Sequence, residues 1–175
     1  MNESPYWFNT SVPLLVPIVV VIGALIATRR ACGLSALDIW TRWWFVGCIG
    51  FGAIVFVGIT FLLIPASMAE QIGYSTANDF QREIAFTNIG WGVAAILAAY
   101  RSATTRMTGL IGYTIFLWGA AVGHIYEYVA HGDHAAGNTG GILVYDVGVP
   151  LVALLLVAAQ QRRPQAAASG RDWTS

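Results

Sequence analysis

The chain carries three histidines, His124, His131 and His134, in one short segment that also contains Glu127. At about 100° per residue, a helix would place His124, Glu127 and His131 on one face. Imidazole and carboxylate side chains together bind zinc, iron or copper, and imidazoles also exchange protons near neutral pH. The His-x-x-Glu-x-x-x-His spacing therefore indicates a transition-metal site or a proton-exchanging cluster.

Two further carboxylates lie at a similar depth in other apolar segments. At a rise of about 1.5 Å per residue, Glu83 and Asp146 fall within about 10 Å of the same predicted membrane face as segment 124–127. Ionisable groups inside a membrane are costly, so we expect them to face the bundle interior or a water-filled cavity. The predicted metal site consists of Glu83, His124, Glu127, His131 and Asp146.

Two uncharged polar side chains are candidates for binding a small polar or quinone-like ligand. Asn88 lies deeper than Glu83 on another face of the same predicted helix, and Tyr145 directly precedes Asp146. A structural alternative remains open, in which hydrogen bonds hold the carboxyl groups and no chemistry takes place. The candidate partners in such a network are Tyr126, Tyr128, Tyr145 and Asn138.

The composition is typical of a membrane protein. The chain is 57% hydrophobic and 10% charged, against about 25% charged in an average soluble domain. Nine acidic residues balance nine basic ones, so no electrostatic argument favours a nucleic-acid partner. Cys32 and Cys48 form no Cys-x-x-Cys pattern, and a thiol-redox or zinc-ribbon function is unsupported. The expected partner is the lipid bilayer, with a membrane-protein complex or a second copy of the chain as further candidates.

Apolar runs of membrane-crossing length predict an all-α integral membrane bundle of five transmembrane helices. The bundle is a single domain over residues 1–163, and the small, polar segment 164–175 is predicted to be a disordered tail. The predicted helices cover residues 12–28, 40–64, 79–100, 107–129 and 142–159.

The arginines predict the orientation of this bundle. All nine basic residues are arginines; eight fall on one side of the predicted membrane, and Arg82 alone falls on the other. By the positive-inside rule the arginine-rich side is cytoplasmic, which places the N-terminus outside and the C-terminus in the cytoplasm. The polar pocket would then lie near the extracytoplasmic face.

Small residues at helical spacing predict two packing seams. Each row continues along its helix to a glutamate, Glu83 in one case and Glu127 in the other, so both carboxylates would point toward other helices. Rows of this kind let transmembrane helices approach closely. The small residues are Gly90, Ala94, Gly119 and Gly123.

Three sequence segments, FQREIAFTNIGWG, GHIYEY and GNTGGILVYD, resemble a family of small uncharacterised bacterial inner-membrane proteins. More distantly they are similar to the DoxX-like four-helix membrane proteins. The resemblance implies a compact helical bundle in a bacterial cytoplasmic membrane. DoxX-like proteins are associated with membrane redox chemistry and oxidative stress, and no motif of this chain carries that role over.

Together these patterns predict an integral membrane protein with a polar, transition-metal-binding pocket near its extracytoplasmic face. The alternative is an accessory or structural subunit of a membrane complex, with a proton-relay or small-ligand pocket and no catalysis of its own. The patterns assign no reaction, so whether the protein is an enzyme stays open.

Overall fold

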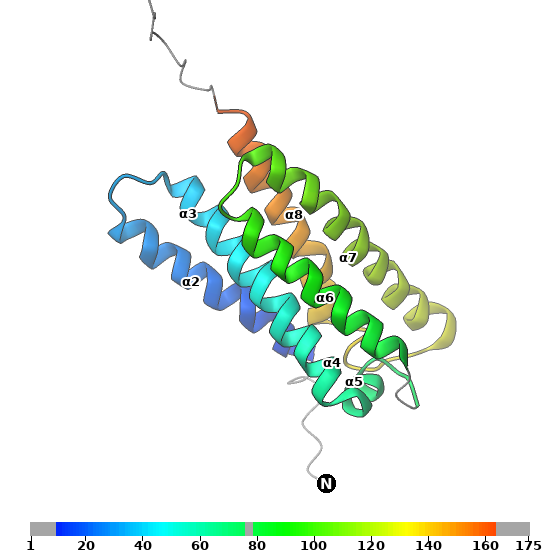
Figure 1. The fold of residues 1–175 in the computed structure, drawn as a ribbon. Helices are drawn as coiled ribbons and strands as arrows, with labels where there is room; N and C mark the ends of the chain where they lie inside the picture. Colours follow the sequence, from blue (N-terminus) through cyan, green and yellow to red (C-terminus); the bar gives the residue numbers. More distant parts are fainter. Residues whose placement is uncertain (1–9, 76–78, 164–175) are drawn as a thin grey trace, which may run out of the picture.

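The computed structural model describes residues 10–75 and 79–163, and within these ranges the chain is helical with no strand. The predicted disordered tail, 164–175, and its Arg171 lie outside the described residues. The described chain forms five long rods that run alternately up and down (Figure 1). This all-α architecture agrees with the predicted helical bundle.

The first two rods are built from several helical segments. A 3-10 turn, η1 (Val12–Leu14), leads into α2 (Leu15–Arg30). The second rod is continuous from α3 (Ala36–Trp43) through the π-helix η2 (Trp44–Ile59) to α4 (Thr60–Leu63). After this rod, a short helix begins at a proline that occupies its first position, where the missing N–H is not needed; this is α5 (Pro65–Gln71).

Each of the last three rods is a single helix: α6 (Asp79–Ala98), α7 (Ala103–His131) and α8 (Gly141–Gln161). Ser102 caps α7 by accepting a hydrogen bond from the Thr105 backbone N–H. Gly132 ends α7 in the left-handed conformation, with φ +66°, which favours glycine because it has no Cβ. The turn that follows returns the chain as α8 beside α7.

Within the described residues, four stretches are long and apolar enough to cross a membrane. The predicted count of five transmembrane helices is therefore not confirmed. The rod that falls short is α6, because its first half contains Gln81, Arg82 and Glu83. The four stretches are Val12–Arg30, Ala36–Leu63, Ala103–His131 and Gly141–Gln161.

Glycines allow η2 and α6 to pack closely together. A Cβ on Gly92 would lie 2.7 Å from the Gly50 carbonyl oxygen and 2.5 Å from Cγ1 of Ile54. Further along the seam, a Cβ on Gly58 would lie 2.5 Å from Cγ1 of Ile89. The second rod winds as a π-helix along this seam, although π-helical segments are commonly single-turn bulges. Glycine therefore sets the distance between these two rods.

The predicted packing seams are wrong. Added Cβ atoms at Gly90, Gly119 and Gly123 would meet nothing within 4 Å, and Ala94 is exposed. The buried face of α6 carries Gly92 instead, about 200° around the helix from Gly90. Small residues suit a helix–helix seam, but they fit a lipid-facing surface equally well, so the pattern alone did not select the buried face.

Candidate functional site at the histidine end

We name the two ends of the bundle the histidine end and the arginine end, after the residues that gather there. The histidine end comprises α5, the last turns of α7, the loop 132–140 and the first turns of α8. The arginine end comprises residues 29–42, 98–106 and 160–163. The antiparallel order of the rods brings sequence-distant segments together at each end (Figure 1).

A histidine–aspartate pair joins α7 to α8 at the histidine end. His124 Nε2 lies 3.6 Å from Asp146 Oδ2. The carboxylate is buried, with 5% of its side chain exposed, while the imidazole is 21% exposed. The pairing follows from the helical hairpin, since the last turns of α7 lie opposite the first turns of α8. The pair therefore joins a buried acid to an imidazole that solvent reaches.

Asn138 holds the other side of the imidazole. Its Oδ1 lies 2.7 Å from His124 Nδ1, and its Nδ2 donates to Asp133 Oδ2 at 2.7 Å and to the Ile72 carbonyl at 3.1 Å. Asn138 is itself buried, at 2% exposure. Because two acceptors face the amide nitrogen, the amide oxygen must be the atom that faces His124.

This orientation fixes the tautomer of His124. An amide oxygen only accepts hydrogen bonds, so Nδ1 of the imidazole must carry a proton and donate it. The neutral ring then presents the lone pair of Nε2 to the Asp146 carboxyl group. At 3.6 Å this nitrogen and the carboxylate oxygen are too far apart for a direct hydrogen bond, and they attract one another as an ion pair when the imidazole is protonated.

The loop that supplies Asn138 is fixed against α5. Gly137 donates from its backbone N–H to the Gln71 carbonyl at 2.6 Å, and a Cβ on Gly137 would lie 2.5 Å from that same oxygen. Asp133 Oδ1 accepts from the Ala135 N–H at 2.8 Å. The glycine-rich segment is therefore needed for close backbone approach, which positions Asn138 over the imidazole.

The remaining predicted ligands lie elsewhere. Glu127 pairs with His131 at 2.7 Å, but these side chains are 46% and 57% exposed and face outward. Glu83 lies on the exposed face of α6. Within residues 10–75 and 79–163, no three histidine, cysteine or acidic side chains are arranged to hold a metal ion. The metal site predicted from Glu83, His124, Glu127, His131 and Asp146 thus gains no support.

The two predicted ligand-binding residues are both buried and engaged. Tyr145 donates its hydroxyl to the Cys48 carbonyl at 2.6 Å, which ties α8 to η2. Asn88 donates to the Ile84 carbonyl of its own helix at 2.9 Å. Their role in ligand binding stays a prediction. Of the partners expected in a structural network, Asn138 does hold ionisable groups, but these are His124 and Asp133 rather than Glu127 or Asp146.

Sequence reasoning missed a second polar network, at the arginine end. Arg106 is 6% exposed, and its guanidinium donates to the Ala98 carbonyl at 3.2 Å and the Ala99 carbonyl at 2.6 Å. It also donates to Gln160 Oε1 at 2.7 Å. Arg106 therefore closes the C-terminus of α6 and joins it to α8. The sequence did contain a signal for this network. An arginine in the first turns of a helix opposes the helix dipole and needs another partner.

The same network continues to the second rod. Gln160 Nε2 donates to Asp38 Oδ1 at 2.8 Å, and the Ser35 hydroxyl donates to Asp38 Oδ2 at 2.5 Å. Arg163 donates to Ser35 Oγ at 2.8 Å. Three rods are thereby joined through side chains at this end.

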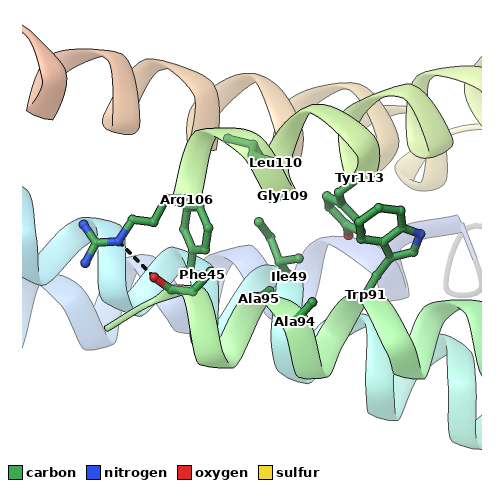
Figure 2. Close-up of a pocket in the computed structure, with 10 residues that line it drawn as sticks. Phe45, Ile49, Trp91, Ala94, Ala95, Arg106, Gly109, Leu110 and Tyr113 are labelled. Atoms are coloured by element: carbon green, nitrogen blue, oxygen red, sulfur yellow. Dashed lines mark hydrogen bonds between the residues drawn. The ribbon is translucent and has the colours of Figure 1, made fainter. Parts of the chain in front are cut away.

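A small crevice of about 30 Å³ lies between η2, α6 and α7 (Figure 2). Its lining is apolar apart from Tyr113 and the arginine-end residue Arg106, whose Nε bond to Ala98 is drawn in Figure 2. Trp91 crosses the crevice from α6 and packs edge-on against Tyr113, with ring centroids 6.1 Å apart. The crevice is separate from the His124–Asp146 pair.

Fold and composition define a helical protein in which four helices of the described ranges are able to cross a membrane, consistent with a multi-pass membrane protein. The chain belongs to the family of unknown function DUF6790, whose model matches residues 10–166. No curated protein and no solved structure matches the chain. The family agrees with the expected uncharacterised membrane family, and nothing in the match supports a DoxX-like relationship or a bacterial source.

Proposed function

We propose that this protein is an integral membrane protein that takes up and releases a proton at the His124–Asp146 pair. The observation that carries the proposal is the geometry of the pair: a buried carboxyl group faces the one imidazole nitrogen that Asn138 leaves free to change protonation. A histidine with one nitrogen fixed and the other facing an acid is suited to proton exchange.

The exposure of the two side chains supports a route to the medium. His124 is partly exposed and Asp146 is buried, so a proton would enter through the imidazole and pass to the carboxylate. Asn138 would keep the ring in one orientation during the transfer, since its amide is itself held by Asp133 and Ile72. This is the proton-relay function expected from the sequence, carried by fewer residues.

The arginine distribution supports the orientation proposed with it. The arginine end would face the cytoplasm and the histidine end the outside, with all five rods inside the bilayer. The polar first half of α6 would be tolerated there because Gln81 and Asn88 are buried in the bundle. A reporter enzyme fused after Arg163 should be active in its cytoplasmic form; activity on the outer side would contradict this orientation.

Metal binding receives less support. Zinc, iron or copper sites need three or four protein ligands around one point. The five predicted ligands divide into an inward pair, an outward pair and Glu83, which lies on the exposed face of α6. Elemental analysis of untagged protein checks this directly: we expect no stoichiometric metal. Bound metal that is lost in both His124→Ala and Glu127→Gln would restore the metal site.

Infrared difference spectroscopy tests proton exchange at the pair. Purified protein is shifted between acidic and alkaline buffer, and the band of a protonated carboxyl group is followed. The wild type should show a band that disappears in Asp146→Asn and shifts in His124→Gln. Asp133→Asn is the matched control, because this half-exposed acid also contacts Asn138 but not the imidazole. A spectrum unchanged by Asp146→Asn would refute the proposal.

A second candidate function is that of a structural or accessory subunit. The observation that favours it is the exposed face of α6, where Glu83 lies in one row with Gly90 and Ala94. A carboxylate on a lipid-facing surface is costly, so a second protein or a second copy would cover this row. If so, Gly90→Leu should lower the assembly mass measured by light scattering in mild detergent. Val122→Leu, on the exposed face of α7, should leave the mass unchanged.

A further inference from the structure

Among the residues that the structure describes, Arg42 is a partly buried cation without an anionic partner. It lies in the last turn of α3, and its Nε is buried. Within the described residues, no acceptor hydrogen-bonds this Nε and no carboxylate pairs with the guanidinium. A buried donor left without an acceptor is destabilising. The protein covers Nε itself, so the terminal guanidinium nitrogens are the donors that an external ligand could reach.

The surroundings of Arg42 are those of a membrane interface. Its guanidinium lies over the Tyr100 ring, 5.5 Å from the centroid, and Tyr100 is exposed. Trp40 and Trp43 flank it in sequence, and Trp43 is 40% exposed. Aromatic side chains of this kind gather at the level of lipid headgroups. Arg42 is therefore at the depth where a headgroup phosphate would lie.

The charge at this end is strongly positive. Asp38 is the one acidic side chain among the described residues of the arginine end, and Gln160, Ser35 and Arg163 already contact it. Arg106 is engaged with carbonyl oxygens and Gln160. The described arginines at this end of the rods are Arg29, Arg30, Arg42, Arg101, Arg106, Arg162 and Arg163.

Apolar residues close to Arg42 and Tyr100 in sequence line a crevice in the bundle. Phe45 lies one turn further along the same rod, on the same face, and lines the crevice between η2, α6 and α7. Ala98, two residues before Tyr100, lines the same crevice. A ligand with an anionic head and an apolar tail would fit this order of groups, since the head meets Arg42 and the tail follows the crevice mouth.

We infer that Arg42 and Tyr100 form a binding site for the phosphate of an anionic membrane phospholipid, with an acyl chain lying along the mouth of the crevice. A phosphodiester accepts two parallel hydrogen bonds from the two terminal nitrogens of a guanidinium. Basic sites between transmembrane helices on the cytoplasmic side recognise lipid headgroups in this manner. The inference rests on the membrane orientation proposed above and is independent of the His124–Asp146 pair.

Native mass spectrometry of the delipidated, detergent-solubilised protein tests the site. Phosphatidylglycerol and phosphatidylcholine with identical acyl chains are titrated separately. We expect one phosphatidylglycerol to bind with about tenfold higher affinity than phosphatidylcholine, as one charge-assisted hydrogen bond accounts for roughly that factor. Arg42→Gln should remove the preference, and Arg42→Lys should retain part of it.

Arg30→Gln is the control, because it removes the same charge from an exposed position at the same end. It should change the affinity by less than about twofold. Equal effects of Arg42→Gln and Arg30→Gln would overturn the site, since they would indicate a diffuse attraction. Full competition by inorganic phosphate would also overturn it, by identifying a free anion as the ligand. Circular dichroism of each variant without lipid shows whether it is folded, and Arg42→Lys decides the result if Arg42→Gln is not.

Discussion

The two ends of the bundle hold the same rods together by different chemistry. At the arginine end, Arg106 carries a permanent charge and donates to carbonyl and amide oxygens that do not titrate. At the histidine end, His124 lies 3.6 Å from the Asp146 carboxylate, and the neutral amide of Asn138 orients the imidazole. The proposed function therefore implies that one end of the bundle responds to pH while the other does not.

Removal of the guanidinium at the arginine end should have the largest effect. Arg106→Met leaves the Ala98 and Ala99 carbonyls and Gln160 without their donor. We expect a loss of about 3 kcal/mol in the free energy of unfolding, measured by denaturant titration in detergent micelles. The loss should be the same at pH 5 and pH 8.

Arg101→Gln is the control for this variant, because Arg101 is exposed at the same end. It should change stability by less than about 0.5 kcal/mol. If Arg106→Met were no less stable than Arg101→Gln, the arginine end would not depend on this network.

Substitution in the glycine seam between η2 and α6 should have the second-largest effect on stability. Gly92→Ala places a Cβ against the backbone oxygen of Gly50, which has little freedom to move. Overpacking of this kind costs about 1–3 kcal/mol. Gly90→Ala, on the open face of the same helix, should be neutral or stabilising by up to about 1 kcal/mol, as alanine favours helices over glycine. Equal thermal stability of the two variants would contradict the assignment of the buried face.

The next largest effect is expected when the Asn138 amide, which orients the His124 imidazole, is removed. Asn138→Ala removes the bonds to His124, Asp133 and Ile72. We expect about 1–2 kcal/mol of destabilisation and faster amide hydrogen exchange confined to the loop 132–140 and the adjoining turn of α5. Faster exchange spread equally to the arginine end would show that the two ends are not separate units.

The smallest effect is expected at the outward pair. Glu127 and His131 are about half exposed, and exposed ion pairs contribute about 0.2–1 kcal/mol. Glu127→Gln should therefore change stability by less than about 1 kcal/mol and leave the infrared carboxyl band of the inward pair intact. A larger loss would mean that this pair belongs to the same site as His124.

The sequence predicted the rods well, because length and hydropathy determine where a helix can lie in a bilayer. The predicted ranges 40–64 and 142–159 correspond to Ala36–Leu63 and Gly141–Gln161. Glu83 was correctly placed in one row with Gly90 and Ala94, and yet that row faces outward. In a membrane protein both the buried and the lipid-facing surfaces are apolar, so periodicity identifies a shared face without identifying its neighbour.

The sequence indicated which residues belong to the candidate site but not how they are grouped in space. His124 and Asp146 were recognised because ionisable groups in apolar helices are conspicuous. Their division from Glu127 and His131 depends on helix rotation, which tertiary packing sets. The Arg106 network was missed because its main acceptors are backbone carbonyls of α6, which no side-chain pattern displays.

Nitrogen-15 NMR of His124 tests the proposed proton exchange most directly. In protein labelled at histidine and reconstituted in lipid, Nδ1 of His124 should remain protonated across the pH range, while Nε2 gains a proton as the pH falls. In Asp146→Asn the Nδ1 proton should persist and the pH dependence of the Nε2 signal should change. A neutral His124 that carries its proton on Nε2, or a pH dependence unchanged by Asp146→Asn, would contradict the proposed exchange.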